Sequence, residues 1–507
     1  MVDGKLLVEK LIKYALKHLH MEKRDEIYFR NLLLREFKLL EPYDGDEDLS
    51  YIDSLSVPDL LTEEIEQYAI ANGLCGEYEE GLYSTYIFGL ISPLPSVVNA
   101  EFNRLKNTEG EKEACKYLYD LSVKNNYVQK TAIGRNLKWE YLDGDKFLEI
   151  TVNLSKPEKD NKEIAKLLTA KKSEKKYPAC FLCKENEGFA GTLTHPAREN
   201  IRTISLKMGG EPWFIQYSPY AYYNEHLIAI SEEHTPMHIA EDTVEKVLDF
   251  VDYLPNYMIG SNAALPIIGG SILNHEHFQG GEHLMPMHYA KIKERFTAIG
   301  FEDVEVGIVD WYNSVIRLKS ESREKIATLS KKIISAWANF SDEACGVFAK
   351  TDGVPHNSLS PVCRKDGKYY VMDMILRNNI TSKEYPDGVF HAHPEYHNIK
   401  KEGIGLIEAM GLFILPGRLK KQLYSIAEIL CGRVSFNRQD KTLLVHNDMI
   451  EELLGEGLSS SMEDAEKRVT DRVNVICKNI LYNTAVFKDD SIGRNGFIKF
   501  LNSVDIK

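Results

Sequence analysis

Residues 266–281, PIIGGSILNHEHFQGG, limit the possible folds more than any other stretch of this sequence. Their apolar half, 266–273, is far shorter than a membrane span and is typical of a buried strand with a Gly-Gly break. On an extended segment, residues at i and i+2 share a face, so His275, His277 and Gln279 would line one edge. The stretch therefore predicts a buried sheet that presents polar side chains.

The rest of the chain mixes helical and strand patterns, which indicates an α+β or α/β class rather than an all-helical fold. Residues 1–130 are predicted to be mostly helical, with a Pro-marked interruption at 91–97, and Leu7, Leu11 and Ala15 fit one apolar helix face. Further helices are expected over 242–254 and after about residue 420. Strands are expected within 136–153, 211–220, 226–231, 266–273, 344–350, 368–378 and 388–393. Residues 400–415 predict a helix or a compact apolar turn, and 156–178 a solvated helix or linker.

Composition narrows the class of protein. The chain has 507 residues, 43% of them hydrophobic, and a net charge of −14, which argues against general binding to nucleic acid or anionic membranes. No run of about 18 unbroken apolar residues predicts a membrane span. The eight cysteines are scattered, so a reduced, cytoplasmic protein is expected.

Cys180 and Cys183 form a CxxC pair, a spacing that lets two thiolates bind one tetrahedral zinc. Pro178 precedes the pair and polar residues follow it, so a zinc knuckle is favoured over a redox pair or two core cysteines. Two more ligands are needed for zinc. The candidates are His195, His226, His234, His275, His277 and His283.

The HxHxQ pattern favours phosphoryl chemistry. A neutral histidine can attack phosphorus when its second ring nitrogen is held by a hydrogen bond. Gln279 could donate to a phosphoryl oxygen, Gly269 and Gly270 allow a close backbone approach, and Ser271 adds a hydroxyl. The alternative is a histidine-rich turn that only binds metal.

A second HxH, His391 and His393, lies inside HAHPEYH. Two such elements in two mixed segments are compatible with an internal duplication, which the divergent spacing does not establish.

Long segments of the chain resemble one family. HxHxQ behind a Gly-rich stretch is similar to the histidine-triad (HIT) superfamily, and the surrounding residues resemble its class II, bacterial galactose-1-phosphate uridylyltransferases. The matching segments are YPACFLCKENEGFAGTLTHPAREN, YYNEHLIAISEEHTPMHI, GSNAALPIIGGSILNHEHFQGG, PHNSLSPVCRKDGKYYVMDMILRNN and YPDGVFHAHPEYHNIKKEGIGLIEAMGLFILPGRL. The resemblance spans nearly the whole chain.

The resemblance implies a two-step transfer in galactose metabolism. His277 would attack the α-phosphorus of UDP-glucose and release glucose 1-phosphate, and galactose 1-phosphate would then take the uridylyl group to give UDP-galactose. Gln279 would hydrogen-bond the phosphoryl oxygens, with Ser271 and Asn262 nearby.

The resemblance also implies metal and substrate ligands. Structural zinc would be bound by Cys180, Cys183, His234 and His275. For His356, His391 and His393 the resemblance implies a second metal site, and the competing interpretation is that His391 or His393 contacts substrate. The basic residues that could bind sugar phosphate, or simply face solvent, are Arg377, Lys400, Lys401 and Arg418. Glu276 stands where class I relatives have a proline.

The implied fold is α+β, with two HIT-like halves and helical segments at both ends. The expected regions are a mostly helical one over 1–155, HIT-like halves over 156–310 and 311–425, and a helical one over 426–507. Class I relatives are dimers, so a homodimer is one expected assembly. A HIT-superfamily nucleotidyl phosphorylase or hydrolase is the nearest alternative activity, and a zinc-stabilised binding protein without turnover is an alternative of another class.

Overall fold

The computed structural model describes residues 2–76, 81–155, 177–192, 195–270 and 272–507. The chain divides into two compact units. Unit 1 contains residues 1–135 and 155–235, and unit 2 contains residues 136–154 and 236–507. The predicted linker over 156–178 lies almost wholly outside the described residues, and the predicted four-region division stays a prediction.

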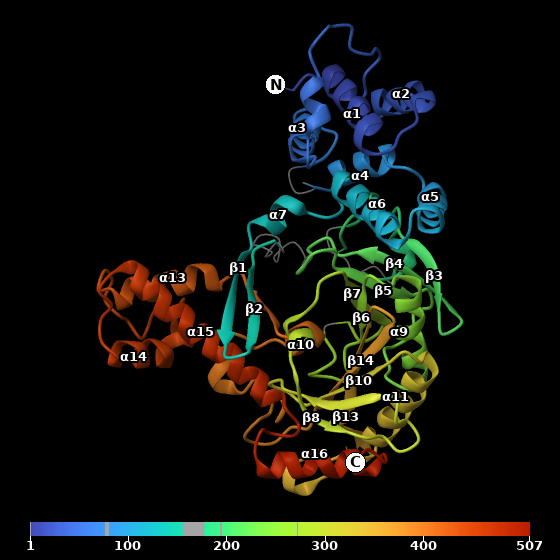
Figure 1. Ribbon diagram of the computed structural model, residues 1–507. Helices are drawn as coiled ribbons and strands as arrows, with labels where there is room; N and C mark the ends of the chain where they lie inside the picture. Colours follow the sequence, from blue (N-terminus) through green and yellow to red (C-terminus); the bar gives the residue numbers. More distant parts are fainter. Residues whose placement is uncertain (1, 77–80, 156–176, 193–194, 271) are drawn as a thin grey trace. The chain divides into compact units, whose positions relative to one another are not determined.

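Unit 1 combines a helical N-terminal segment with a short run of antiparallel strands (Figure 1). Its helices are α1 (Gly4–His18), α2 (Glu26–Glu36), α3 (Asp59–Ala71), α4 (Leu82–Ile91), α5 (Pro95–Thr108), α6 (Glu111–Lys124) and α7 (Lys130–Gly134). Its strands pair in the order β3 (Ile204–Met208), β4 (Glu211–Tyr217) and β5 (Leu227–Ser231).

The N-terminal helix forms for the reason that the sequence indicates. Leu7, Leu11 and Ala15 are fully buried along one face of α1. The Asp3 carboxylate caps the helix by accepting hydrogen bonds from the backbone N–H of Lys5, at 2.9 Å, and of Leu6, at 3.3 Å. The predicted break at 91–97 is confirmed, because α4 ends at Ile91 and α5 begins at Pro95.

Unit 2 is built on a mainly antiparallel sheet with a separate three-stranded sheet. The main strands run in the order β7 (His277–Gly281), β6 (Met258–Gly260), β13 (Asn357–Asp366), β14 (Tyr369–Asn378), β10 (Val315–Ser320), β9 (Glu305–Val309) and β8 (Ile292–Phe296). The smaller sheet has the order β1 (Leu137–Asp143), β2 (Lys146–Asn153) and β15 (Leu412–Pro416). A short hairpin joins β11 (Lys350–Thr351) to β12 (Val354–Pro355).

Two helices, α9 (Glu241–Tyr253) and α11 (Arg323–Trp337), contact the main sheet and each other. Val244, Val247 and Val251 recur at helical spacing in α9 and are fully buried. Asp252 of α9 accepts a hydrogen bond from Tyr370 at 2.7 Å, which identifies the sheet face that carries Tyr370 as the one facing α9. Strand residues of opposite parity therefore face away from this helix.

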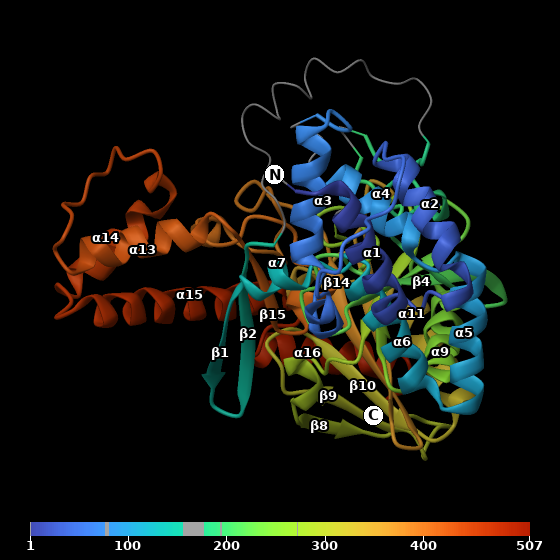
Figure 2. The same ribbon diagram turned by 90° about the horizontal axis from the view of Figure 1, so that it is seen from above.

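The remaining helices of unit 2 are short or lie near the C-terminus. They are α10 (Pro286–Tyr289), α12 (Leu406–Ala409), α13 (Leu419–Leu430), α14 (Asn447–Gly455), α15 (Met462–Thr484) and α16 (Ser491–Ser503). Helices α13, α14 and α15 lie side by side in both views (Figure 2). The predicted helical tail and the α+β class with helical segments at both ends are confirmed. Within the described ranges, no helix combines the length and apolarity that crossing a bilayer would demand.

Three predicted strands are wrong. Within the first range, residues 266–270 and 272–273 form a turn and irregular chain, because Ile267 and Gly270 have φ values of 75° and 79°, in the left-handed region that a strand excludes. Residues 388–393 form turns that begin at Gly388, with φ of 118°. The predicted strand at 344–350 begins instead within a 3₁₀ turn, Glu343–Cys345. Gly346 ends this turn with a φ of 68°, in the left-handed region.

Candidate functional site

His277 is the first residue of β7, and its backbone neighbour fixes its ring. The ring Nδ1 lies 2.8 Å from the carbonyl oxygen of His275, so Nδ1–H donates to that oxygen. A neutral imidazole with its proton on Nδ1 has a lone pair on Nε2. Burial lowers the pKa of His277 to about 4, which keeps the ring neutral near pH 7. The side chain therefore has the tautomer and charge that a nitrogen nucleophile requires.

Gln279 lies two residues farther along β7 and is half-buried. Residues at i and i+2 of a strand share a face, so the side chains of His277 and Gln279 lie on the same face of β7. Gly280, the residue after Gln279, faces α9, since a Cβ built there would lie 3.5 Å from the Phe250 ring. His277 and Gln279 therefore face away from α9.

An ion pair that sequence reasoning missed holds the turn between the two histidines. Glu276 and Lys246 are almost fully buried, and Lys246 Nζ lies 3.0 and 3.1 Å from the two carboxylate oxygens of Glu276. Asp242 lies 2.9 Å from the same ammonium. The only sequence signals were a lysine beside the apolar face of α9 and a glutamate between two histidines.

The loop before β7 is organised around Asn262. Its Oδ1 accepts a hydrogen bond from the backbone N–H of Leu406 at 2.8 Å. A Cβ added at Gly270 would lie 3.1 Å from Asn262 Nδ2, and one at Gly269 only 2.5 Å from the Leu265 carbonyl oxygen. Both glycines are therefore needed for close packing. Ser271 lies outside the described residues.

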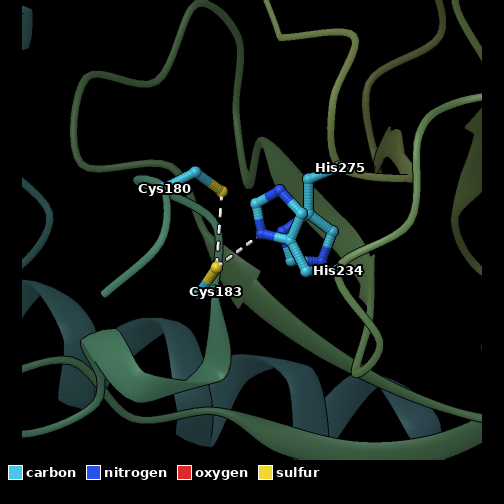
Figure 3. Close-up of side chains that lie close together, drawn as sticks. All are labelled: Cys180, Cys183, His234 and His275. Atoms are coloured by element: carbon cyan, nitrogen blue, oxygen red, sulfur yellow. Dashed lines mark hydrogen bonds between the residues drawn. The ribbon is translucent and has the colours of Figure 1, made fainter. Parts of the chain in front are cut away.

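Cys180 and Cys183 lie in the turn before the 3₁₀ helix η4 (Lys184–Asn186), and not at the start of an α-helix. Their sulfur atoms are 3.5 Å apart, and Cys183 Sγ lies 3.0 Å from Nδ1 of His234, three residues after β5 (Figure 3). The candidate ligand atoms of Cys180, Cys183, His234 and His275 all lie within 4.8 Å of one another.

This donor set fits a zinc ion. Two thiolates and two imidazoles are a common tetrahedral structural set. Burial, followed by the hydrogen bond with Cys180, raises the pKa of the Cys183 thiol to about 11, so a thiolate here needs a nearby cation. Asn186, which sequence reasoning missed, steadies the turn by donating from Nδ2 to the carbonyl oxygens of Cys180, at 2.9 Å, and Cys183, at 2.8 Å.

The other candidate ligands of the CxxC pair do not join this cluster. His195 donates from Nε2 to Asn186 Oδ1 at 2.6 Å, and its ring contacts Phe181. His283 lies 2.8 Å from a carboxylate oxygen of Glu149. These two histidines thus have structural contacts of their own.

In the second half, His356, His391 and His393 do not form a metal-binding group among the described residues. His391 Nε2 accepts from the Ile404 backbone N–H at 3.2 Å, and burial lowers the pKa of His391 to about 4. His393 donates to the Val389 carbonyl oxygen at 3.0 Å and stacks on Tyr385. His356 is hydrogen-bonded to Asn379 at 2.9 Å.

The basic candidates are mostly engaged within the protein. Arg418 donates to the carbonyl oxygen of Asn398 and to Gln422, and fully buried Arg377 donates to the Ile404 carbonyl oxygen at 2.7 Å. Lys400 pairs with Glu408 at 2.9 Å, and Lys401 is exposed. Their contacts with substrate stay predictions.

Comparison with known proteins decides the family. The N-terminal domain model of galactose-1-phosphate uridyl transferase matches residues 24–236, and the C-terminal domain model matches residues 249–443. A galactose-1-phosphate uridylyltransferase of Caldanaerobacter subterraneus subsp. tengcongensis is 44% identical over 100% of this chain and 99% of its own length. One of Clostridium acetobutylicum is 41% identical over 98% of this chain and 99% of its own. This chain belongs to the galactose-1-phosphate uridylyltransferase family.

The two domain models of the galactose-1-phosphate uridylyltransferase family divide the site residues. The N-terminal model spans Cys180, Cys183 and His234, and the C-terminal model spans His277 and Gln279. Among solved structures, yeast Ap4A phosphorylase Apa2 aligns with a TM-score of 0.33 and 11% identity, covering 71% of this chain and 92% of that chain.

Proposed function

We propose that this protein transfers UMP from UDP-glucose to galactose 1-phosphate, giving UDP-galactose and glucose 1-phosphate. Membership of the family, with relatives named galactose-1-phosphate uridylyltransferase at 44% and 41% identity over nearly the whole chain, supports this reaction. The observation that carries the mechanism is the hydrogen bond from His277 Nδ1–H to the carbonyl oxygen of His275, which directs the lone pair to Nε2.

In the first step, Nε2 of His277 attacks the α-phosphorus of UDP-glucose. A nitrogen–phosphorus bond forms, the bond from the α-phosphorus to the bridging oxygen breaks, and glucose 1-phosphate leaves with that electron pair. In the second step, a phosphate oxygen of galactose 1-phosphate attacks the uridylyl group, and His277 leaves as neutral imidazole. Glucose 1-phosphate leaves as an anion of low basicity and His277 leaves as a neutral imidazole, so neither step needs a general acid.

The neighbouring residues bind and orient the phosphates. The Gln279 amide donates to the phosphoryl oxygens as charge develops on them. Asn262, whose Oδ1 accepts from Leu406, offers its Nδ2 protons, and Gly269, Gly270 and Ser271 are the other proposed contacts of the phosphates. The substrate-binding residues proposed in the second half are His391, His393 and Arg418.

A zinc ion would be bound by Cys180, Cys183, His234 and His275. It would supply structural cross-linking and no reaction step, because four protein ligands leave it no open position. For His391 and His393 we propose substrate contact rather than a second metal. A cytoplasmic setting, where thiols stay reduced, suits the two cysteines, and a homodimer is the proposed assembly.

Steady-state kinetics test the reaction. With both substrates varied, the double-displacement scheme predicts parallel double-reciprocal lines and formation of UDP-galactose only when galactose 1-phosphate is present. Formation of UMP from UDP-glucose alone, at a rate equal to that with acceptor, would instead establish a hydrolase.

A further inference from the structure

Unit 2 contains a polar cavity, of about 310 Å³, on the face of the main sheet that points away from α9. Arg317 is paired with Asp373 and Arg364 with Val371 on neighbouring strands, so these four side chains share one sheet face. Tyr370, next to Val371, points to the other face, where it contacts α9. Six cationic or potentially cationic side chains contribute to its wall: His288, Lys291, Arg295, Arg317, Lys319 and Arg364.

Most of these cations are paired with carboxylates. Arg317 binds Asp373 at 2.5 and 3.0 Å and also donates to the backbone carbonyl oxygens of Met287 and Ala290. The other pairs are Lys291 with Asp145 at 2.5 Å, Arg295 with Glu305 at 3.2 Å, and Lys319 with Asp366 at 2.6 Å. Five cationic side chains thus face four carboxylates.

Arg364 is the cation that has no such partner. Within the described part of the chain it forms no ion pair, and its buried Nη1 has no hydrogen-bond acceptor. Both carboxylate oxygens of the nearby Asp373 already accept hydrogen bonds from one edge of the Arg317 guanidinium, through Nε and Nη2. A buried guanidinium donor without an acceptor is unfavourable, so the cavity lacks one strong acceptor.

His288 supplies a second donor to the same cavity. It is 7% exposed, and its Nδ1 accepts a hydrogen bond from the Met285 backbone N–H at 3.1 Å. Burial lowers the pKa of His288 to about 3, so the ring is neutral and its proton resides on Nε2. Nε2 is buried and, among the described residues, has no acceptor.

We propose that this cavity binds a small phosphate-type dianion between the Arg364 guanidinium and Nε2–H of His288. A guanidinium fork matches the oxygen edge of a phosphate, and the remaining oxygens can accept from His288 and from the flexible ammonium groups at the rim. Inorganic phosphate and the phosphate of a sugar phosphate share this chemistry.

The cavity is separate from the proposed nucleophile. Gln279, Gly260, Val362, Asp373 and Arg317 are directly opposed on successive strands and so share one sheet face. Arg364, which would bind the ligand, lies on β13, two strand spacings from β7 and two residues beyond Val362, on the side of Gln279 away from His277. Two strand spacings and four residues therefore separate Arg364 from His277, which is about 16 Å. A ligand here would be a second occupant of the enzyme and not the reacting phosphate.

Calorimetric titration of the full chain with inorganic phosphate, and separately with glucose 1-phosphate, tests the proposal. Arg364→Met and His288→Gln should each weaken one binding event about tenfold or more, because each removes a donor to a charged ligand. Arg438→Met is the matched control, because Arg438 is exposed, pairs with Glu451 and does not line the cavity. The affinities of this variant for both probes should stay within about twofold of those of wild type.

Each outcome is decisive. Weakened binding of inorganic phosphate in both variants supports a general phosphate site, and weakened binding of glucose 1-phosphate alone supports a sugar phosphate site. Unchanged affinity for both probes in either folded variant would overturn the proposal, as would absence of a second binding event in wild type at millimolar probe. Circular dichroism establishes that each variant is folded.

Discussion

Replacing Lys246 with Met should destabilise unit 2 by about 3–5 kcal/mol, because the substitution leaves a buried carboxylate without its ammonium partner. The side chains of Lys246 and Glu276 are only 2% and 3% exposed, and the ammonium lies 3.0 Å from Glu276 Oε1 and 2.9 Å from Asp242 Oδ2. Without Lys246, the two carboxylates share only the His238 ring, which lies 2.8 Å from Asp242 Oδ2 and 3.9 Å from Glu276 Oε1. Methionine retains most of the apolar stem, so the loss is chiefly electrostatic.

The partner substitution should be milder. Glu276→Gln leaves Lys246 paired with Asp242, which is half exposed, so a loss of about 1–3 kcal/mol is expected. The double variant Lys246→Met, Glu276→Leu should recover most of the stability, because two apolar side chains replace the pair without leaving a charge.

Urea unfolding followed by tryptophan fluorescence measures these differences. Lys331→Met is the matched control, since Lys331 pairs with Glu245 at 2.6 Å while both side chains are about one-third exposed, and a loss of about 0–1 kcal/mol is expected. A loss for Lys246→Met no larger than that for Lys331→Met, or a double variant less stable than Lys246→Met, would contradict a stabilising buried ion pair.

Three further predictions address the metal, the glycine loop and pH. Cys183→Ala should abolish bound zinc measured by elemental analysis, whereas Cys363→Ala, at a buried cysteine outside the cluster, should retain it; equal zinc in both would contradict the ligand assignment. Gly269→Ala should cost about 1–3 kcal/mol, since its Cβ would lie 2.5 Å from a backbone oxygen, while Gly134→Ala, with open space around its Cβ, should be neutral or stabilising in the same unfolding assay. Burial raises the pKa of Glu199 from 4.5 to about 7, so its ionisation opposes folding, and stability present below about pH 4.5 is lost as pH rises through 7. As pH rises from 5 to 8, the free energy of unfolding of Glu199→Gln should therefore increase by about 1 kcal/mol relative to that of wild type, a figure reduced for the partial exposure of Glu199. A difference in unfolding free energy that stays constant across this pH range would contradict the prediction.

The sequence predicted the parts of the site that depend on local spacing. The CxxC turn, the shared strand face of His277 and Gln279, and the position of His234 after a strand all follow from residues within a few positions of one another. The N-terminal helix was equally predictable, since the apolar spacing of Leu7, Leu11 and Ala15 already defines the buried face.

The missed features depend on contacts between distant residues. Lys246 and Glu276 are 30 residues apart, and no local pattern marks two buried charges as partners. The mostly apolar residues 266–270 form a loop beside Asn262, but apolarity alone does not distinguish such a loop from a buried strand. The left-handed backbone of Ile267 could not be foreseen, because a β-branched residue rarely adopts it.

The most direct test of the account is the intact mass of the protein after mixing with UDP-glucose and no acceptor. Wild type and His20→Ala, which removes an exposed histidine of unit 1, should both gain one uridylyl group and lose it when galactose 1-phosphate is added. His277→Ala should gain nothing. An adduct of the same mass on His277→Ala, or none on wild type while UDP-galactose still forms, would contradict a covalent intermediate on His277.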